Sequence, residues 1–355
     1  MIINRRINNA LDRAPYDSRS ALATLVARAM LITKPAALLR GIKKRGKRWW
    51  LTRQMRRVWM ALQTRANKDI CSIEIANTTY GFFAQMNCCL WILAYCERRG
   101  VIPYIRLTND TYRDPNRGAN WLEHYFDTID TISPDQANRV RYTNKVLELE
   151  DMEQFITDRI TIEDGARIFN KYLRVKPHIS SIVHDFWENL GVTGPVLGIH
   201  FRGTDHSTES PRVSYEHCLS VVRNYLRNHG SIEGVFVASD ELEFIRFMEA
   251  SIKDLPVYWH DDHYRSLGYS PVPVFLSTGG GYEKGEDALV NALLLARCST
   301  LIRTTSTLSA WASIFNPALK VILLNKSYRN NLWYPESQII GRLDTEYCPE
   351  VATML

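Results

Sequence analysis

The sequence predicts an α/β protein with two Rossmann-like halves that face each other across a cleft. Strand-like apolar segments alternate with helical segments through the second half, which is typical of parallel sheets covered by helices. The chain has 355 residues, 45% of them hydrophobic and 23% charged, so it is globular but longer than one comfortable core. We place the domains at residues 69–182 and 183–340, after residues 1–68 and before a tail of residues 341–355.

The first half is predicted to begin with a strand-helix-strand unit. Residues 70–75 alternate in polarity like a strand, residues 83–98 form an apolar helical pattern, and residues 102–107 form a second strand pattern. Such a unit implies a parallel sheet. A long helical pattern over residues 162–190 is interrupted near Lys176-Pro177, and it is expected to join the two halves.

The second half alternates strictly between strands and helices. This order predicts a doubly wound sheet, in which ligands bind where the carboxyl ends of the strands meet. The three glycines at 279–281 lack the spacing of a dinucleotide-binding fingerprint and are expected to form a flexible loop. Strands are predicted at residues 196–201, 235–238, 257–259, 300–303 and 321–324, and helices at residues 214–228, 241–251, 286–297 and 307–314.

Three loops that follow predicted strands carry polar residues. They read His-Phe-Arg-Gly-Thr-Asp at 200–205, Ala-Ser-Asp at 238–240 and Arg-Thr-Thr-Ser-Thr at 303–307. Arg202 offers a planar guanidinium fork for a phosphate, and a helix that begins near Ser306 offers hydroxyl and backbone N–H groups. Together these groups suit a diphosphate.

Structural roles are the alternative for the same residues. Arg202 would then form an ion pair with Asp205 or Asp240. Ser306, Thr307 and Asp240 would act as plain helix caps.

The sequence lacks the motifs of several other kinds of nucleotide-binding and metal-binding site. The chain has no Walker-type phosphate loop, no Asp-x-Asp motif and no zinc spacing among its cysteines. Residues 260–263 read His-Asp-Asp-His, but adjacent loop residues rarely point to one centre, so we expect solvated side chains there. The expected chemistry therefore uses no metal and no other cofactor.

Basic residues are concentrated at the N-terminus. Residues 1–68 contain 17 Lys and Arg against two Asp, a net charge of +15, whereas the whole chain carries +6. Within this basic arm, residues 36–62 combine helical apolar spacing with cations and three tryptophans, a composition found at membrane surfaces. We expect an anionic membrane surface as its partner, and packing on the acidic remainder of the chain is the alternative. No nucleic acid is expected, because no binding motif accompanies the charge.

Cysteine usage and hydropathy indicate a compartment. The chain has no run of 18 apolar residues, and charged residues interrupt the N-terminal stretch. Its seven cysteines are odd in number, with Cys88 next to Cys89. We expect a cytoplasmic protein with reduced thiols, held at the inner face of the membrane by its arm.

Four motifs of this chain resemble those of GDP-fucose-dependent fucosyltransferases, with the α1,6-fucosyltransferases and the rhizobial nodulation enzyme nearest in pattern. The resemblance covers about residues 69–325 and is strongest over residues 196–310. Residues 200–205 resemble the family's His-x-Arg-Arg-Thr-Asp donor motif, residues 235–240 its strand ending in Asp, residues 291–307 its helix-strand-Ser-Ser element, and residues 81–85 its glycine-containing loop.

The resemblance implies a GT-B fold and an inverting, metal-independent transfer of fucose from GDP-fucose to a glycan or glycolipid. It implies that Arg202 contacts the β-phosphate of the donor and that Asp205 lies nearby. Glu209 is the candidate base, with Glu216 and Asp205 behind it. A solvated surface role is the alternative for Glu209. The expected donor-binding residues are His200, Thr204, Asp240, Asp287, Asn291, Thr305, Ser306, Thr307, Gly81 and Gln85.

Two departures from the family pattern keep other functions open. Gly203 stands where the family has a second arginine, and Asn291 stands where α1,6-fucosyltransferases carry an aspartate that reads guanine. Asp287, one helical turn earlier, is the candidate substitute. The alternatives are a different nucleotide-sugar donor, or an inactive protein that binds glycans or nucleotides. Aromatic residues at 108–150, such as Trp121 and Tyr125, are expected either to shape the acceptor site or to pack in the interior.

Overall fold

The computed structural model describes residues 70–75, 80–99, 102–129, 140–143, 160–204, 210–327, 339–340 and 346–350. All of them belong to one compact unit, which comprises residues 70–148 and 152–355. The predicted basic arm, with residues 36–62, lies outside the described residues, and so do Asp205 and Glu209. The division into domains at residue 182 stays a prediction.

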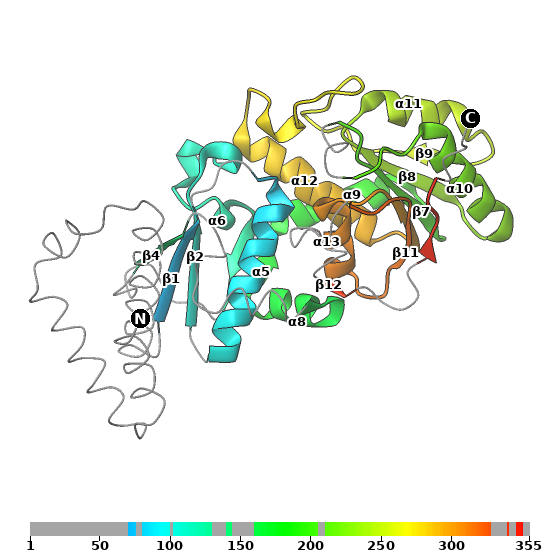
Figure 1. Cartoon of the computed structure of the whole chain (residues 1–355). Helices are drawn as coiled ribbons and strands as arrows, with labels where there is room; N and C mark the ends of the chain where they lie inside the picture. The colour runs from blue at the N-terminus through cyan, green and yellow to red at the C-terminus, as the bar shows by residue number, and fades with distance from the viewer. Residues whose placement is uncertain are drawn as a thin grey trace, which may run out of the picture. The chain divides into compact units, whose positions relative to one another are not determined.

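The first half contains the predicted strand-helix-strand unit. Strands β1 (Ile70–Ile75), β2 (Ile102–Leu107) and β4 (Val140–Thr143) form a parallel sheet in the order β2-β1-β4. Helix α5 (Phe82–Arg99) connects β1 to β2 (Figure 1). Its side chains are buried on all sides from Phe82 to Cys96, apart from the half-buried Ala84, which explains why this stretch is apolar except for Gln85 and Asn87.

A series of short helices and strands connects this sheet to the second half of the sequence. The interruption predicted near Lys176-Pro177 is confirmed, because Pro177 occupies the first turn of α9, where its missing N–H costs nothing. Residues 173–175, however, form a strand, β6, which pairs antiparallel with β3. The elements are 3-10 turns at Asp110–Tyr112 and Pro115–Arg117, α6 (Leu122–Tyr125), β3 (Phe126–Thr128), β5 (Ile160–Thr161), α8 (Ile162–Tyr172), β6 (Leu173–Val175) and α9 (Pro177–Leu190).

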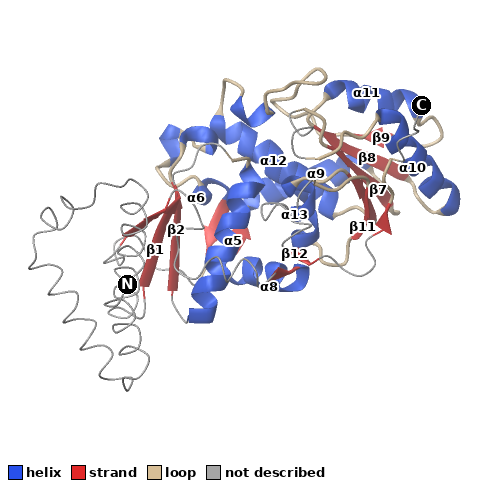
Figure 2. Cartoon of the chain, viewed as in Figure 1, coloured by secondary structure: helices blue, strands red, loops and turns tan. Residues whose placement is uncertain are grey.

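The predicted α/β architecture is confirmed in the second half, which contains a six-stranded parallel sheet in the order β13-β11-β10-β7-β8-β9 (Figure 2). Residues 346–347, assigned to the tail by sequence, extend this sheet as β13. The strands are β7 (Val196–Phe201), β8 (Gly234–Ser239), β9 (Val257–Tyr258), β10 (Thr300–Arg303), β11 (Lys320–Leu323) and β13 (Glu346–Tyr347), the helices are α10 (Tyr215–Asn228), α11 (Leu242–Ser251), α12 (Gly281–Ala296) and α13 (Thr307–Phe315), and β12 (Ile339–Ile340) pairs with β5.

Both faces of the central strand β7 are covered. Leu197 and Ile199 belong to the apolar core that includes residues of α10 and α11. Gly198 points the other way, where an added Cβ would lie 3.0 Å from the sulfur of Cys298, just after α12. A strand buried on both faces reads as an unbroken apolar run, which is why the sequence predicted it correctly.

Helix α12 begins at Gly281, five residues before its predicted start, so the glycines at 279–281 are not simply a flexible loop. An added Cβ at Gly281 would lie 2.8 Å from the carbonyl oxygen of Arg113 and 3.0 Å from that of Asp110. The missing side chain therefore allows the first turn of α12 to approach another backbone closely. Gly279, with φ of 120°, occupies the left-handed region that favours glycine.

Aromatic packing joins the two halves of the unit. The rings of Tyr125 and Tyr282 stack at 5.2 Å, and the indole Nε1 of Trp311 donates to Asn87 Oδ1 at 2.5 Å. Trp121 and Tyr125 are fully buried, so the packing alternative for these aromatic residues holds. Within the described part of the chain, every helix is too short or too polar to cross a bilayer.

Replacement of Gly285 by alanine tests the α12 contact. An added methyl would collide with the buried hydroxyl of Tyr125, whose ring is pinned against Tyr282. We expect Gly285→Ala to lower the free energy of unfolding by about 1–3 kcal/mol, despite the better helix propensity of alanine. Gly230→Ala is the matched control, because open space surrounds Gly230. Equal denaturation midpoints for the two variants would contradict this packing.

Candidate functional site

The three loops singled out by sequence lie side by side. Strand β7 is flanked by β10 and β8 in parallel register, so the carboxyl ends of all three strands meet at one edge of the sheet. The backbone N–H of Arg202 donates to the hydroxyl of Thr304 at 2.8 Å, which ties the loop after β7 to the loop after β10. The expected convergence of these loops is therefore present in the structure.

Asp240 organises the loop after β7. Its carboxylate accepts hydrogen bonds from the Arg202 guanidinium at 2.6 Å, the Thr204 hydroxyl at 2.6 Å and the Gly203 backbone N–H at 3.0 Å. Burial alone would raise the pKa of Asp240, but the positive charge of Arg202 and the bonds from Thr204 and Gly203 more than offset this, so the pKa lies below its ordinary value. Asp240 is therefore a carboxylate at neutral pH.

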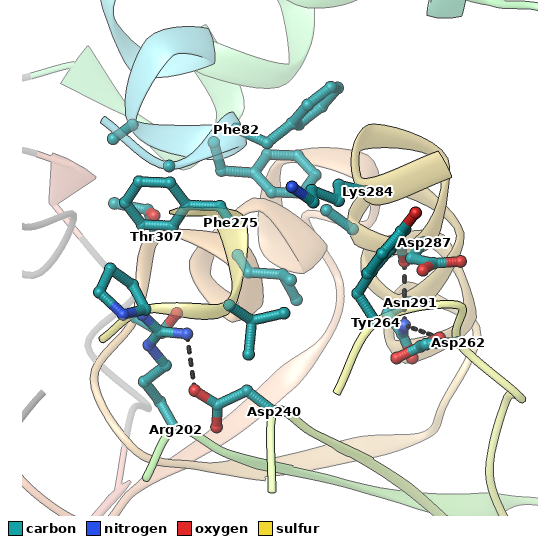
Figure 3. Close-up of a pocket in the computed structure, with 18 of the residues that line it drawn as sticks. Phe82, Arg202, Asp240, Asp262, Tyr264, Phe275, Lys284, Asp287, Asn291 and Thr307 are labelled. Carbon is teal, nitrogen blue, oxygen red and sulfur yellow. Dashed lines mark hydrogen bonds and ion pairs between the residues drawn. The ribbon is translucent and has the colours of Figure 1, made fainter. Parts of the chain in front are cut away.

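Arg202 has both of the features that the sequence analysis treated as alternatives, an ion pair and a position suited to a ligand. It forms the ion pair with Asp240 that was weighed as its structural alternative, and it also lines a cavity (Figure 3). The side chain is 20% exposed, and its base is anchored through the Thr304 bond. The ion pair holds one end of the guanidinium at the cavity wall, and the planar fork suits directional recognition of an oxyanion.

Helix α13 directs its N-terminus at the same cavity. Ser306 occupies the capping position but makes no side-chain capping bond, and Ser306 and Thr307 both line the cavity. The first backbone N–H groups of a helix and its dipole favour an anion. Thr305 is fully buried and its backbone N–H donates to Asn325 Oδ1 at 2.6 Å, so it supports the loop from behind.

The cavity has a volume of about 420 Å³ and is lined by both halves of the unit. Residues 80–84 and Tyr112 contribute from the first half, and an apolar segment at 273–276 forms another wall. Figure 3 shows Arg202 and Asp240 on one side of the cavity, whereas Asp262, Asp287 and Asn291 gather on another side. The cavity therefore suits an elongated ligand with chemically different ends.

One face of α12 supplies the second polar end. Lys284, Asp287 and Asn291 recur at helical spacing and all line the cavity. Burial lowers the pKa of Lys284, whose ammonium donates to the carbonyl oxygen of Ser277. Burial, with Asp262 nearby, raises the pKa of Asp287. This end thus holds a cation beside a group of hydrogen-bond acceptors.

The expectation for residues 260–263 was partly wrong. His260 and Asp262 do meet, at 2.8 Å, and one ligand atom each from His260, Asp262 and Asp287 lie within 4.8 Å of one another. Asn291 on α12 also contacts this group, because its amide nitrogen donates to Asp262 Oδ1 at 2.7 Å. The guanidinium of Arg265 lies 2.6 Å from Asp262 Oδ2, so a protein cation already accompanies this carboxylate.

Gly203, the departure from the family's donor motif, has a packing cause. An added Cβ would collide with the carboxyl group of Glu241, which is fully buried. The Tyr215 hydroxyl donates to Glu241 Oε2 at 2.6 Å, and Arg212 lies 3.9 Å from Oε1. Burial raises the pKa of Glu241. An arginine at position 203 would require Glu241 to move.

Most of the described residues predicted for the site do line the cavity. Thr204 and Gln85 do not, and like Thr305 they are fully buried supports: Thr204 bonds to Asp240, and Gln85 accepts from Asn109 Nδ2 at 2.6 Å. The predicted residues that line the cavity are Gly81, His200, Arg202, Asp240, Asp287, Asn291, Ser306 and Thr307.

Sequence analysis missed other residues of the cavity. Lys284 was missed because α12 was predicted to begin at residue 286; the helical spacing 284, 287, 291 would have revealed it. Tyr264 and Phe275 lie in the long connection between β9 and α12, where no periodic pattern marks them.

Comparison with solved structures finds similarity to GDP-fucose fucosyltransferases over most of the chain at low sequence identity. Fucosyltransferase NodZ from Bradyrhizobium is 18% identical with a TM-score of 0.45, covering 73% of this chain and 94% of that chain. NodZ α-1,6-fucosyltransferase soaked with GDP-fucose is 17% identical with a TM-score of 0.45, covering 73% and 95%. A mutant of FUT1 from Arabidopsis thaliana in complex with GDP is 12% identical with a TM-score of 0.43, covering 78% and 74%. No protein-family model matches the chain, and no curated protein matches it in sequence.

Proposed function

We propose that this protein is a glycosyltransferase that moves fucose from GDP-fucose to a glycan or glycolipid, by an inverting reaction without a metal. The observation that carries the proposal is the Arg202 guanidinium, fixed by Asp240 at the wall of a cavity into which α13 directs its N-terminus. The two groups together offer charge and backbone N–H donors to a diphosphate.

Departure of a nucleoside diphosphate places negative charge on its β-phosphate. Fixed donors that face this charge stabilise the transition state without reorganisation. Lys284 is a further cation in the cavity wall, and an anion nearby would favour its charged form.

Fucose as the sugar and guanine as the nucleotide base are supported by the motifs at residues 81–85, 200–205, 235–240 and 291–307. The acceptor hydroxyl must lose a proton, and Glu209, with Asp205 behind it, is the proposed base. An anionic membrane surface as the partner of residues 36–62 rests on the composition of that segment.

A different nucleotide-sugar donor is the second candidate, favoured by Asn291 and Gly203. Turnover of a panel of nucleotide sugars by the full chain separates the candidates. Release of GDP from GDP-fucose supports the proposal, and turnover of another donor supports the second candidate. Binding without turnover of any donor, with glycan acceptors present, would indicate an inactive binding protein.

Arg202→Lys should lower the transfer rate by about 10²–10³-fold while the fold is retained. Lysine keeps the charge and can still pair with Asp240, but it loses the planar fork that holds an oxyanion. The rate is measured as GDP release under saturating donor. Arg223→Lys, on α10, is the matched control, because Arg223 contacts the carbonyl of Ser251 rather than the cavity. Equal rates for the two variants would remove Arg202 from its proposed role.

Transfer should persist after treatment with EDTA, because protein cations and a helix terminus face the departing diphosphate. The measurement is the initial rate of GDP release before and after chelation, and again after Mg²⁺ or Mn²⁺ is added. Loss of activity that either ion restores would contradict the metal-independent reaction. It would also direct attention to His260, Asp262 and Asp287, whose ligand atoms lie close together.

A further inference from the structure

The side-chain amide of Asn291 is held between two acceptors. Its nitrogen Nδ2 donates to Asp262 Oδ1 at 2.7 Å and to the backbone carbonyl of Asp287 at 2.9 Å. Both amide hydrogens are therefore used, and a reversed amide would place its oxygen against two acceptors. The orientation of Asn291 is fixed by this pair of bonds.

The amide oxygen of Asn291 is left as a buried acceptor. Asn291 is 5% exposed, and Oδ1 has no hydrogen-bond partner among the residues that the structure describes. A buried acceptor without a partner is unfavourable and is rare in native proteins. Asn291 also lines the cavity, so a ligand N–H is the natural partner for this oxygen.

Asp262 is itself held from two other sides. His260 Nδ1 lies 2.8 Å from Oδ1, and the guanidinium of Arg265 donates to Oδ2 at 2.6 Å. Figure 3 shows Asp262 facing Asn291 across this corner of the cavity. The Asp262 carboxylate is therefore fixed in one orientation, and it can fix the orientation of the Asn291 amide.

Asp287, the candidate substitute for a base-reading aspartate, is occupied elsewhere. Its Oδ2 accepts from the backbone N–H of His263 at 2.8 Å, and its Oδ1 lies 2.9 Å from His263 Nδ1. Its contribution to Asn291 is the backbone carbonyl. This leaves the amide oxygen of Asn291 as the group prepared for a ligand.

We propose that Asp262 is a positioning residue for donor specificity: it turns the Asn291 amide so that the oxygen accepts a hydrogen bond from the nucleotide base. The site then favours guanine, whose N1 and N2 both carry hydrogens. Adenine in the same pose would turn the acceptor N1 and a C2–H toward Asn291 Oδ1 and is disfavoured. This inference rests on the proposed function, since it requires a nucleotide in the cavity.

The arrangement also explains why asparagine stands at position 291. An aspartate there would place a carboxylate oxygen about 2.7 Å from Asp262 Oδ1, with Asp287 close by. Like charges at that distance strongly disfavour the doubly ionised state. The carboxylate therefore resides on the loop and the amide on the helix, where the second amide hydrogen also meets the Asp287 carbonyl.

The test measures affinities of GDP, ADP and pyrophosphate for the full chain by calorimetry. Asp262→Asn keeps the shape, but its own amide can offer Asn291 either a donor or an acceptor. The Asp287 carbonyl is then the one fixed acceptor that remains of the two that hold Asn291 Nδ2. We expect the preference for GDP over ADP to fall by at least tenfold, with pyrophosphate affinity unchanged because Arg202 and α13 are untouched. The matched control is Asp254→Asn, because Asp254 is an exposed carboxylate before β9.

Asn291→Asp should also weaken GDP binding, because its carboxylate would face the acceptor Asp262 Oδ1 and the Asp287 carbonyl. If Asp262→Asn does not fold, Asp262→Ser decides, since it also removes the fixed acceptor, and an unchanged preference for GDP in that variant overturns the inference. An unchanged preference in a folded Asp262→Asn also overturns it and leaves the proposed function standing. If the unaltered chain binds no nucleotide, the proposed function and the inference both fail.

Discussion

The carboxylate of Asp240 is the group on which the arrangement of the site depends. It is almost buried, and it receives the guanidinium of Arg202, the backbone of Gly203 and the hydroxyl of Thr204 in one cluster. Without it, the guanidinium of Arg202 would lose this ion pair, and the backbone N–H of Gly203 would lose its acceptor next to the sheet edge. Asp240 can reach these groups because β7 and β8 are adjacent and parallel. The pairing of the two strands therefore also determines where the Arg202 side chain points.

The cavity has a chemical polarity that gives a ligand one direction. Arg202 and the N-terminus of α13 form an end that favours negative charge, whereas Asp262, Asp287 and Asn291 form an end rich in acceptors. Phosphate groups are repelled from the acceptor end, and a base with N–H donors gains little beside Arg202. The apolar segment at 273–276 and Phe82 lie along the cavity, where they can exclude water. Orientation of the ligand is therefore built into the charge distribution.

The sheet and the strand-end residues were predictable because buried parallel strands are unbroken apolar runs, and because the residue after such a strand must lie at the sheet edge. Arg202 and Asp240 follow from that rule, and Ser306 follows from the predicted start of the next helix. Asp262 and Tyr264 do not, since they lie in a connection without periodicity and their positions depend on α12. The burial of Trp121 was equally inaccessible, because sequence marks an aromatic residue but not whether a partner covers it.

A structure of the full chain with GDP tests the central claim most directly. The account predicts a β-phosphate within hydrogen-bond distance of the Arg202 guanidinium and of the first backbone N–H groups of α13, and a guanine edge against Asn291 Oδ1. A diphosphate bound elsewhere, or held by a metal ion at His260, Asp262 and Asp287, would contradict it.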